Sequence, residues 1–399
     1  MDQETATGDE VVRIRGVQLD ALVRRVFGKR VSKVGTRRSD FRSKRLDVFK
    51  RFLAFCYDEV LAFPDPEWPW YRMGRNRALH VAKEFEPDIL LSSAPPFSSH
   101  LMGGHIQHRL KIPWVADYRD LWSLNLVRKR TKFVRRMESY LERRTLKGCS
   151  AAATVSEPLA RELHELLGIP VNVVTNGFDP ADYEADIKEP PTEWKDNKIN
   201  MVHTGLLYPG LRDPSVLFQA IQILYKSGSI REGDLKIWFY GPNVDGIKDM
   251  ISDYSVGPFV ELAGLVPRKE ALNCQRQADV LLLLEWADSM AKGLFTGKFF
   301  EYLGAGKPIL AIGASGGVIE HTLKETGMGV LENDPYRLAK IIQDLIQTKS
   351  MKGRGTLHPA DPKALKRYTR EYQAGVLGEI LNDVLRRTSS LSSRKSRSR

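Results

Sequence analysis

The sequence predicts an α/β protein built from two parallel-sheet domains joined by a linker. Short apolar runs alternate with amphipathic segments in both halves of the chain, and this alternation stops once, over residues 179–198, before it restarts. Apolar strands that alternate with amphipathic helices are typical of a parallel sheet covered by helices on both faces. The 399 residues also exceed one ordinary core and fit two domains of roughly 100–200 residues each.

The expected elements follow the chain in a regular order. In the first half we expect strands at 88–92, 113–116, 151–155 and 171–174 and helices at 99–110, 132–146 and 157–167. In the second half we expect strands at 199–203, 235–240, 259–262, 280–284, 309–312 and 329–331 and a helix at 215–225. Each strand is a short apolar run between turn residues, and each helix has an apolar stripe of helical period.

These elements define five segments. Residues 1–40 are basic and weakly patterned, which predicts poor order. Residues 41–185 and 196–360 are the two domains, 362–387 is a helix that could return to the amino-terminal domain, and 388–399 is a Ser/Arg-rich tail expected to be disordered. Within 40–63, apolar residues at helical spacing predict a helix that packs on the core. The alternative for that stretch is a basic amphipathic helix on an acidic membrane.

The net charge of +12 calls for an anionic partner: nucleic acid, an acidic membrane face or a phosphorylated ligand. Nucleic acid is not expected, because the chain has no recognised nucleic-acid module and little interleaving of aromatic and basic residues. The three scattered cysteines, Cys56, Cys149 and Cys274, have neither metal-ligand spacing nor the pairing of a disulfide framework. They fit a reducing compartment, so we expect a cytoplasmic protein.

No signal peptide or membrane-spanning segment is expected. The amino-terminus is acidic and polar. The most apolar runs, 53–63 and 280–286, are short and contain Asp58, Glu59 and Glu285, which a bilayer span would not tolerate.

The segment 293–308 combines a glycine-containing loop, a hydroxyl group, a cation and the start of a helix. Backbone N–H groups at a helix start attract phosphate, Thr296 could cap the helix, and Lys298 adds a compact positive charge for a diphosphate. Glu301, about one turn later, could accept hydrogen bonds from ribose hydroxyls. The alternative is an ordinary turn followed by an N-capped helix with solvated charges.

The segment 203–214 has a similar design. A strand ends, Gly205 lets a ligand approach closely, and a helix starts near Pro214. Arg212 then lies beside a helix amino-terminus, where a positive side chain is unfavourable. A bound anion would remove this conflict, whereas the alternative is a surface arginine in a loop.

In the first half, charged residues follow a strand directly. Asp117, Arg119 and Asp120 come after the strand 113–116, so they are candidates for catalysis. The alternative is a local ion pair between Asp117 and Arg119 that shapes the loop. A second loop at a strand end contains Pro95, Pro96 and His100. His100 could be a base or an acceptor contact, or simply a histidine at a helix start.

The order and spacing of several short runs, from about Pro64 to the last helix, resemble those of the family-4 type retaining glycosyltransferases of the GT-B fold. The resembling runs are 203–214, 239–242, 262–266 and 296–310 in the second half, and 87–90, 93–96, 112–122, 152–156 and 175–179 in the first. The resemblance implies two Rossmann-like domains that face each other across a cleft. The amino-terminal sheet would lack its first strand or strands, because residues 1–40 contain no apolar strand with a glycine-rich loop.

The resemblance also implies roles. Arg212 and Lys298 would neutralise the donor diphosphate as it leaves, and Glu301 matches the glutamate that holds the donor ribose. The further donor-binding residues would be Gly205, Gly241, Leu265, Val266 and Thr296, with Leu265 and Val266 beside the base. Asp117, Arg119 and Asp120 would lie near the transferred sugar, with Pro95, Pro96 and His100 on the acceptor side. No metal and no cofactor besides the nucleotide-sugar co-substrate are expected.

The expected function is therefore transfer of a sugar from a nucleotide-diphosphate sugar to a glycan or lipid-linked acceptor, with retention, in polysaccharide or glycoconjugate biosynthesis. Surplus basic residues at 37–50, 128–136 and 395–399 could hold the protein on an anionic inner membrane face. Gly293 stands where the resembled family has its first glutamate. The alternative function is a catalytically degenerate or truncated GT-B protein that acts as a non-catalytic binding partner.

Overall fold

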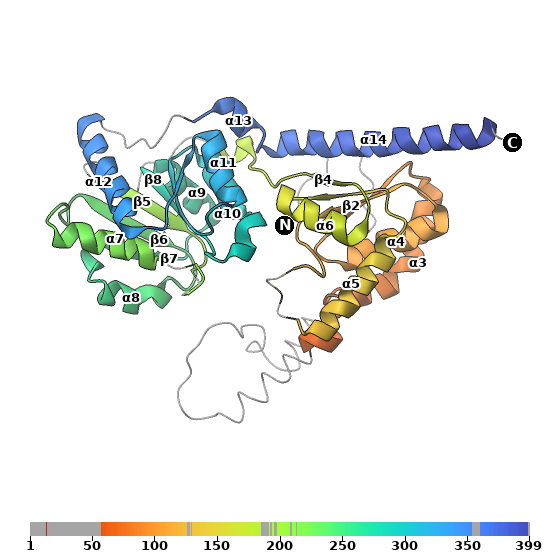
Figure 1. Cartoon of the computed structure of the whole chain (residues 1–399), viewed down its shortest axis with the longest axis horizontal. Helices are drawn as coiled ribbons and strands as arrows, with labels where there is room; N and C mark the ends of the chain where they lie inside the picture. Colours follow the sequence, from red (N-terminus) through yellow and green to blue (C-terminus); the bar gives the residue numbers. More distant parts are fainter. Residues whose placement is uncertain are drawn as a thin grey trace, which may run out of the picture. The chain divides into compact units, whose positions relative to one another are not determined.

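The computed structural model describes residues 13, 57–125, 128, 130–184, 191, 194, 198–207, 210–212, 214–352 and 360–397. Side chains are not described for residues 57, 58, 289, 290, 350–352 and 391–397. The expectation of poor order for 1–40, the apolar stripe before residue 57 and much of the linker 179–198 lie outside the described residues. The chain divides into two compact units, each with its own parallel sheet (Figure 1).

Unit 1 comprises Met1–Thr154, Leu159–Val173 and Glu379–Arg399. Its described strands, all parallel and in the order β1-β2-β3-β4, are β1 (Leu90–Ala94), β2 (Trp114–Tyr118), β3 (Ala151–Thr154) and β4 (Val171–Val173). Its helices are η2 (Tyr57–Leu61), α3 (Trp68–Phe85), α4 (Ser98–Leu110), α5 (Lys132–Leu146) and most of α6 (Glu157–Leu167). The part of α14 (Arg370–Arg397) from Glu379 onward also belongs to this unit.

Small residues bring the helices of unit 1 close to its sheet. A Cβ atom on Gly103 of α4 would lie 2.8 Å from the Trp114 ring, and one on Gly104 would lie 2.9 Å from the Thr145 carbonyl oxygen of α5. Both glycines are therefore required for the close approach of α4 to β2 and α5. Elsewhere in the unit, Val115 of β2 and Ala151 of β3 pack against three residues of α14: Ile380, Leu381 and Val384.

Unit 2 comprises Val155–Pro158 and Val174–Gly378. Its parallel strands are β5 (Ile199–Thr204), β6 (Leu235–Tyr240), β7 (Val260–Gly264), β8 (Val280–Leu284), β9 (Ile309–Ile312) and β10 (Gly329–Leu331). Its α-helices are α7 (Ser215–Lys226), α8 (Lys248–Asp253), α9 (Arg268–Gln277), α10 (Gly297–Ala305), α11 (Val318–Thr326), α12 (Pro335–Lys352), α13 (Pro362–Lys366) and the start of α14. Short turns η3 (Pro180–Tyr183), η4 (Val244–Ile247), η5 (Gly257–Phe259) and η6 (Ser289–Gly293) connect them.

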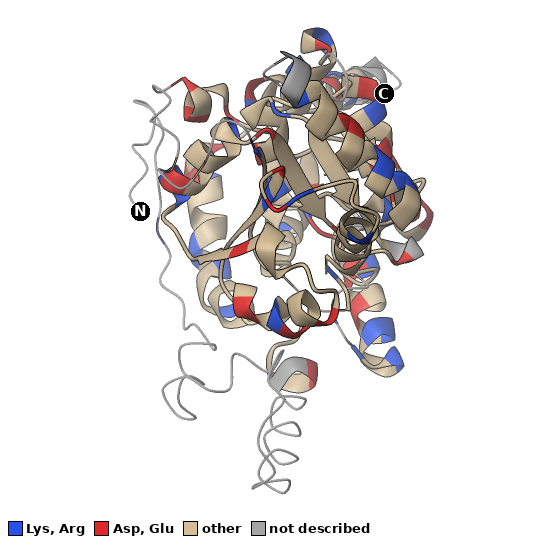
Figure 2. Cartoon of the chain, turned by 90° about the vertical axis from the view of Figure 1, so that its left-hand side faces the viewer, with Lys and Arg blue, Asp and Glu red and all other residues tan. Residues whose placement is uncertain are grey.

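The sheet of unit 2 is buried on both faces, because successive strand residues point to opposite sides. Met201 and Leu282 pack with α7 and α12 in one core cluster, whereas Val202 and Leu283 pack with α10 and α11 in the other. In Figure 2 the strands at the centre are mostly tan, and the charged residues lie mainly on the surrounding helices and loops. This double burial explains why the strands are continuous apolar runs in the sequence.

The strand order of unit 2 contains one reversal. In the order β10-β9-β8-β5-β6-β7, the chain moves outward from β5 through β6 to β7, then returns to β8 on the other side of β5. Such a reversal opens a crevice at the carboxyl ends of the two strands, and ligands of open α/β sheets bind there. The four described strands of unit 1 run in sequence order and have no such point.

The elements confirm most of the sequence predictions. Helices α5 and α6 and strands β6, β8, β9 and β10 have the predicted bounds, and the other predicted strands and helices of the two domains are shifted by one or two residues at one or both ends. The single helix predicted over 362–387 is wrong, because the chain forms two helices there, α13 and α14. The prediction of disorder from residue 388 is wrong as far as Arg397, because α14 continues to that residue without a break. Among the described residues, no helix is both long enough and apolar enough to cross a membrane.

Candidate functional site

Three glycines, Gly205, Gly241 and Gly264, lie at the carboxyl ends of β5, β6 and β7. The Gly205 N–H donates to the Tyr240 carbonyl oxygen at 2.8 Å, and the Gly241 N–H donates to the Gly264 carbonyl oxygen at 2.7 Å. A Cβ atom on Gly241, which has a φ of 148°, would lie 2.2 Å from the Gly205 carbonyl oxygen. Only glycine fits this position, so the ends of β5 and β6 can lie in direct contact.

Lys298 lies beside Gly205, in the first turn of α10. A Cβ atom on Gly205 would be 3.2 Å from the Lys298 Nζ atom, so the missing side chain of Gly205 leaves room for the ammonium group. Nζ is shielded from solvent and has no hydrogen-bond partner among the described residues. Burial lowers the pKa of Lys298 to about 8, although Glu285 and Glu301 oppose this shift. A desolvated cation of this kind favours an anionic ligand.

Thr296 occupies the N-cap position of α10, but its side chain does not cap the helix. The Thr296 hydroxyl instead donates a 2.5 Å hydrogen bond to Glu285 Oε1. The capping expectation for Thr296 is therefore wrong, because its side chain is turned toward Glu285, just after β8, and its oxygen accepts no N–H of the helix. The N–H groups of the first turn consequently lack a side-chain cap, and such groups attract anions.

Glu285 also pairs with Arg212. Arg212 Nη2 lies 3.3 Å from Glu285 Oε2, and the guanidinium carbon lies 5.7 Å from the centre of the Trp286 ring. Burial raises the pKa of Glu285, while Arg212 and Thr296 act in the opposite direction. Arg212 follows β5 and Glu285 follows β8, so the pair joins the two strands that flank the reversal in strand order.

The carboxylate of Glu301 lies about one turn along α10 and is partly exposed. Gln275 Nε2 donates to it at 3.4 Å, and Arg268 Nη2 lies 3.7 Å from it. Arg268 in turn donates to Asp182 at 2.9 Å. Tyr183, next to Asp182, donates to the Glu301 carbonyl oxygen at 2.9 Å. These contacts hold Glu301 in place and leave its carboxylate accessible to a ligand hydroxyl.

Beneath the cations lies His203, which is fully buried. Burial and the nearby Lys298 charge lower its pKa well below the ordinary value, so the imidazole is neutral. His203 Nδ1 lies 2.9 Å from the Leu282 carbonyl oxygen and must be the donor, which leaves Nε2 as a buried acceptor without a partner among the described residues. His203 therefore contributes polarity without adding charge.

Sequence reasoning placed Gly205, Gly241, Arg212, Thr296, Lys298 and Glu301 in one site, and the structure puts all six at the carboxyl edge of one sheet. Leu265 and Val266 follow β7 at the same edge, and Leu265 is 77% exposed. The residues that sequence reasoning missed are Asp182, His203, Arg268, Gln275 and Glu285. Only Glu285 carried a detectable sequence feature, a carboxylate directly after an apolar strand.

In unit 1, Asp117 and Arg119 form the local ion pair that was the alternative interpretation. The Arg119 Nε–H donates to Asp117 Oδ1 at 3.0 Å, and the Ser93 hydroxyl donates to Asp117 Oδ2 at 2.7 Å. Asp117 is buried by these contacts. The pair therefore shapes the loop after β2 and ties it to β1.

Pro95, Pro96 and Asp120 line a pocket of about 430 Å³ within unit 1. His100 does not line this pocket, because it lies in the core with its Nδ1 2.9 Å from the Ser92 hydroxyl oxygen. Burial lowers the pKa of His100 to about 3. Because His100 is fully buried, its side chain cannot contact a sugar acceptor. The structure therefore favours the alternative, a histidine at a helix start.

Gly293, which replaces the first glutamate of the resembled family, ends η6 and is buried. Its carbonyl oxygen accepts a 2.7 Å hydrogen bond from the Ser156 hydroxyl. In the described part of the chain, no three His, Cys, Asp or Glu side chains gather closely enough to hold a metal ion.

Residues 37–182 match the family model described as Glycosyltransferase Family 4. No curated protein matches the chain. The structure is similar to the Anabaena protein Alr3699/HepE solved in complex with UDP, with a TM-score of 0.55, 17% identity and coverage of 77% of this chain and 82% of that chain. It is also similar to a glycosyltransferase from Rickettsia africae, with a TM-score of 0.51, 14% identity and coverage of 80% and 79%.

A third similar structure is sucrose-phosphate synthase from Thermosynechococcus elongatus, with a TM-score of 0.51, 12% identity and coverage of 79% of this chain and 78% of that chain. At these identities the likeness shows the fold, which is GT-B. The family match over the amino-terminal part and the shared fold together support a glycosyltransferase enzyme.

Proposed function

We propose, from the family match and the GT-B fold, that this chain transfers a sugar from a nucleoside-diphosphate sugar to a glycan or lipid-linked acceptor, with retention, and without a metal or other cofactor. One observation carries the donor assignment. Lys298 Nζ is buried beside Gly205 without a hydrogen-bond partner among the described residues, at the reversal in strand order of unit 2.

The chemistry of the donor explains what this arrangement does. During transfer the bond between the anomeric carbon and the diphosphate oxygen breaks, a bond to the acceptor oxygen forms, and the acceptor hydroxyl loses its proton. Negative charge therefore develops on the leaving diphosphate. Lys298, Arg212 and the uncapped N–H groups of α10 are fixed positive groups that stabilise such charge without rearranging.

Glu301 and the exposed Leu265 serve the rest of the donor in this proposal. The Glu301 carboxylate accepts hydrogen bonds from ribose hydroxyls, and the backbone and side chains of Leu265 and Val266 lie beside the base. In unit 1, Asp120, Pro95 and Pro96 line the pocket that we assign to the acceptor side. Asp117 and Arg119 then act by positioning the loop after β2.

The test is direct binding of nucleoside diphosphates to the full chain by isothermal titration calorimetry, starting with UDP because Alr3699/HepE was solved with it. Lys298→Ala should weaken binding roughly 10- to 100-fold, since one charge-assisted hydrogen bond contributes about 1.5–3 kcal/mol. Lys340→Ala is the matched control, because Lys340 is exposed on α12. Equal affinity in the wild type and Lys298→Ala would show that the donor site is misassigned.

Turnover decides between an enzyme and a non-catalytic binding partner. The chain should release the free nucleoside diphosphate from its nucleotide sugar only when a suitable glycan or lipid-linked acceptor is added. The anomeric configuration of the product, read from its NMR coupling constants, tests retention. Nucleotide binding without any transfer to a broad acceptor panel would support the degenerate protein instead.

We also propose that the protein works in the cytoplasm, in glycan or glycoconjugate synthesis, and contacts an anionic membrane surface peripherally. The net charge of +12 supports this contact, because a nucleotide sugar requires only a few cations. Cell fractionation with and without a high-salt wash tests it, and we expect the wash to release the protein.

A further inference from the structure

Helix α5 buries both of its glutamates and exposes three large apolar side chains. Its buried residues are Val134, Glu138, Glu142 and Leu146. Its large exposed apolar residues are Phe133, Met137 and Tyr140, which are 72%, 43% and 66% exposed. A surface helix normally buries its apolar stripe and exposes its charges, so the sequence of α5 requires a specific explanation.

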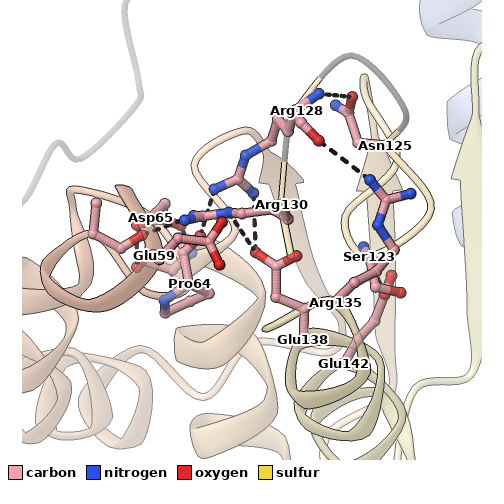
Figure 3. Close-up of polar contacts among 12 residues, drawn as sticks. Glu59, Pro64, Asp65, Ser123, Asn125, Arg128, Arg130, Arg135, Glu138 and Glu142 are labelled. Carbon is pink, nitrogen blue, oxygen red and sulfur yellow. Dashed lines mark hydrogen bonds and ion pairs between the residues drawn. The ribbon is translucent and has the colours of Figure 1, made fainter. Parts of the chain in front are cut away.

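The two buried glutamates bind the loop that follows β2. Glu138 Oε1 lies 3.4 Å from both Arg128 Nη1 and Arg130 Nε. Glu142 Oε2 accepts a 3.0 Å hydrogen bond from the Ser123 N–H. Figure 3 shows Glu138 and Glu142 projecting from α5 toward Ser123, Arg128 and Arg130. The middle of the inward face of α5, between the buried Val134 and Leu146, is therefore occupied by buried glutamates and their partners, and three large apolar residues lie on the outer face.

The outward residues form one continuous face. Phe133, Met137 and Tyr140 are separated by four and three positions, so they lie on one side of the helix. The same face carries the exposed basic residues Lys132, Arg136, Arg143, Arg144 and, just after the helix, Lys147. The only acidic residues of α5 are Glu138 and Glu142, and both are buried. We call these eight outward residues the α5 face.

We propose that the α5 face docks on the surface of a lipid bilayer that contains anionic headgroups. Aromatic and aliphatic side chains that alternate with Arg and Lys on one helix side are suited to an interface, where the apolar groups enter the acyl boundary and the cations meet the headgroups. The inference deepens the peripheral membrane contact proposed above by naming the surface, and it does not depend on the donor site.

Charge argues against the other occupants. A second copy of this chain would bring two positive faces together, which costs free energy. Residues 1–56 contain more Lys and Arg than Asp and Glu, so they would be repelled too. A nucleic acid would use the cations and would not require exposed Phe133 and Met137.

The experiment is co-sedimentation of the full chain with vesicles of phosphatidylcholine alone or mixed with phosphatidylglycerol. The wild type should bind only the mixed vesicles, and less strongly at high salt. Phe133→Ser/Met137→Ser/Tyr140→Ser should weaken binding about tenfold or more. Arg136→Gln/Arg143→Gln/Arg144→Gln should weaken it roughly a hundredfold, since each cation near an anionic surface contributes about fivefold.

Phe85→Ser is the matched control for the apolar variant. Phe85 ends α3 in the same unit and is 68% exposed, so its loss should leave vesicle binding unchanged. Nucleotide affinity, measured on every variant, should equal that of the wild type. This measurement separates a failure of the membrane proposal from a failure of the donor site, and urea unfolding of each variant shows that unit 1 is folded.

Hydrogen exchange supplies a test without substitution. Mixed vesicles should slow the exchange of the α5 amides in the wild type and leave those of α12 unchanged. The proposal is overturned if the full chain ignores mixed vesicles, or if the apolar variant binds them as tightly as the wild type. It is also overturned if α5 gains no protection.

Discussion

Arg212 Nη2 lies 3.3 Å from Glu285 Oε2, and this contact links the loops after β5 and β8. These strands flank the reversal in strand order of unit 2. The two residues are far apart in the sequence, and neither loop alone forms the site. Glu285 also receives the Thr296 hydroxyl, so one carboxylate positions both an arginine and the start of α10.

Arg212→Ala should destabilise the protein by about 2 kcal/mol, because it leaves the buried Glu285 carboxylate without its cation. Arg212→Ala/Glu285→Gln should recover part of this loss, since a neutral amide is less costly to bury. Urea unfolding of the wild type, both single variants and the double variant measures the coupling. If the losses are simply additive, the pair makes no energetic contribution.

Gly241→Ala should destabilise more than an alanine substitution at an ordinary positive-φ glycine. Its Cβ would overlap the Gly205 carbonyl oxygen at 2.2 Å. Gly228 has a φ of 70° and nothing within 4 Å of such a Cβ, so Gly228→Ala should cost only about 1 kcal/mol. Thermal unfolding compares the two, and equal losses would contradict the close approach of the two strand ends.

Nucleotide binding should weaken as the pH rises through about 8. Burial lowers the pKa of Lys298 to about 8, so the ammonium charge is present below this pH and is lost above it. The anionic diphosphate therefore loses its partner, and the affinity falls at most about tenfold per pH unit. Lys298→Arg should remove the pH dependence, because arginine stays charged. Calorimetric titrations at pH 7 and 9 test this.

The lowered pKa of Lys298 also predicts how the stability of the ligand-free protein depends on pH. The folded-state pKa of Lys298 lies below the usual 10.5, so the unfolded chain binds more protons between these two values. Unfolding free energy should then rise with pH from about 8 to 10.5. Lys298→Met should show a smaller rise in urea unfolding across this range.

Glu301→Ala should lower the affinity for a nucleoside diphosphate about tenfold, by the loss of hydrogen bonds to ribose hydroxyls. Its affinity for inorganic pyrophosphate should stay unchanged, because pyrophosphate has no ribose. Competition against a fluorescent nucleotide measures both ligands in one assay. A parallel loss for both ligands would indicate that Glu301 acts on the diphosphate end.

Nucleotide binding and sugar transfer should not require a divalent metal. Fixed cations and helix N–H groups supply the positive charge that a metal provides elsewhere. Thermal shifts with nucleotide should be equal in EDTA and in magnesium. A transfer rate that falls to background in EDTA and recovers with magnesium would refute this prediction.

Much of this molecule was readable from the sequence. The strands of unit 2 are buried on both faces, so continuous apolar runs such as 280–284 predicted β8 with its bounds. Helices α5 and α6 were also predicted with their bounds, from the alternation of apolar strands with amphipathic segments. For α14 the Ser/Arg composition suggested disorder after residue 387, but the helix continues to Arg397. A Ser/Arg-rich composition indicates that a segment does not pack in a core. It does not prevent that segment from continuing a helix whose earlier turns are packed.

Local sequence also found the candidate donor residues, because glycines and charges that follow buried strands mark the carboxyl edge of a parallel sheet. Sequence alone therefore determined the fold class and the edge at which to search. Only the tertiary structure decided which side chains meet there. Partners such as Arg212 and Glu285, or Asp182 and Arg268, become neighbours through strand order. The structure also placed His100 in the core and turned the glutamates of α5 inward, because burial depends on what packs against each face.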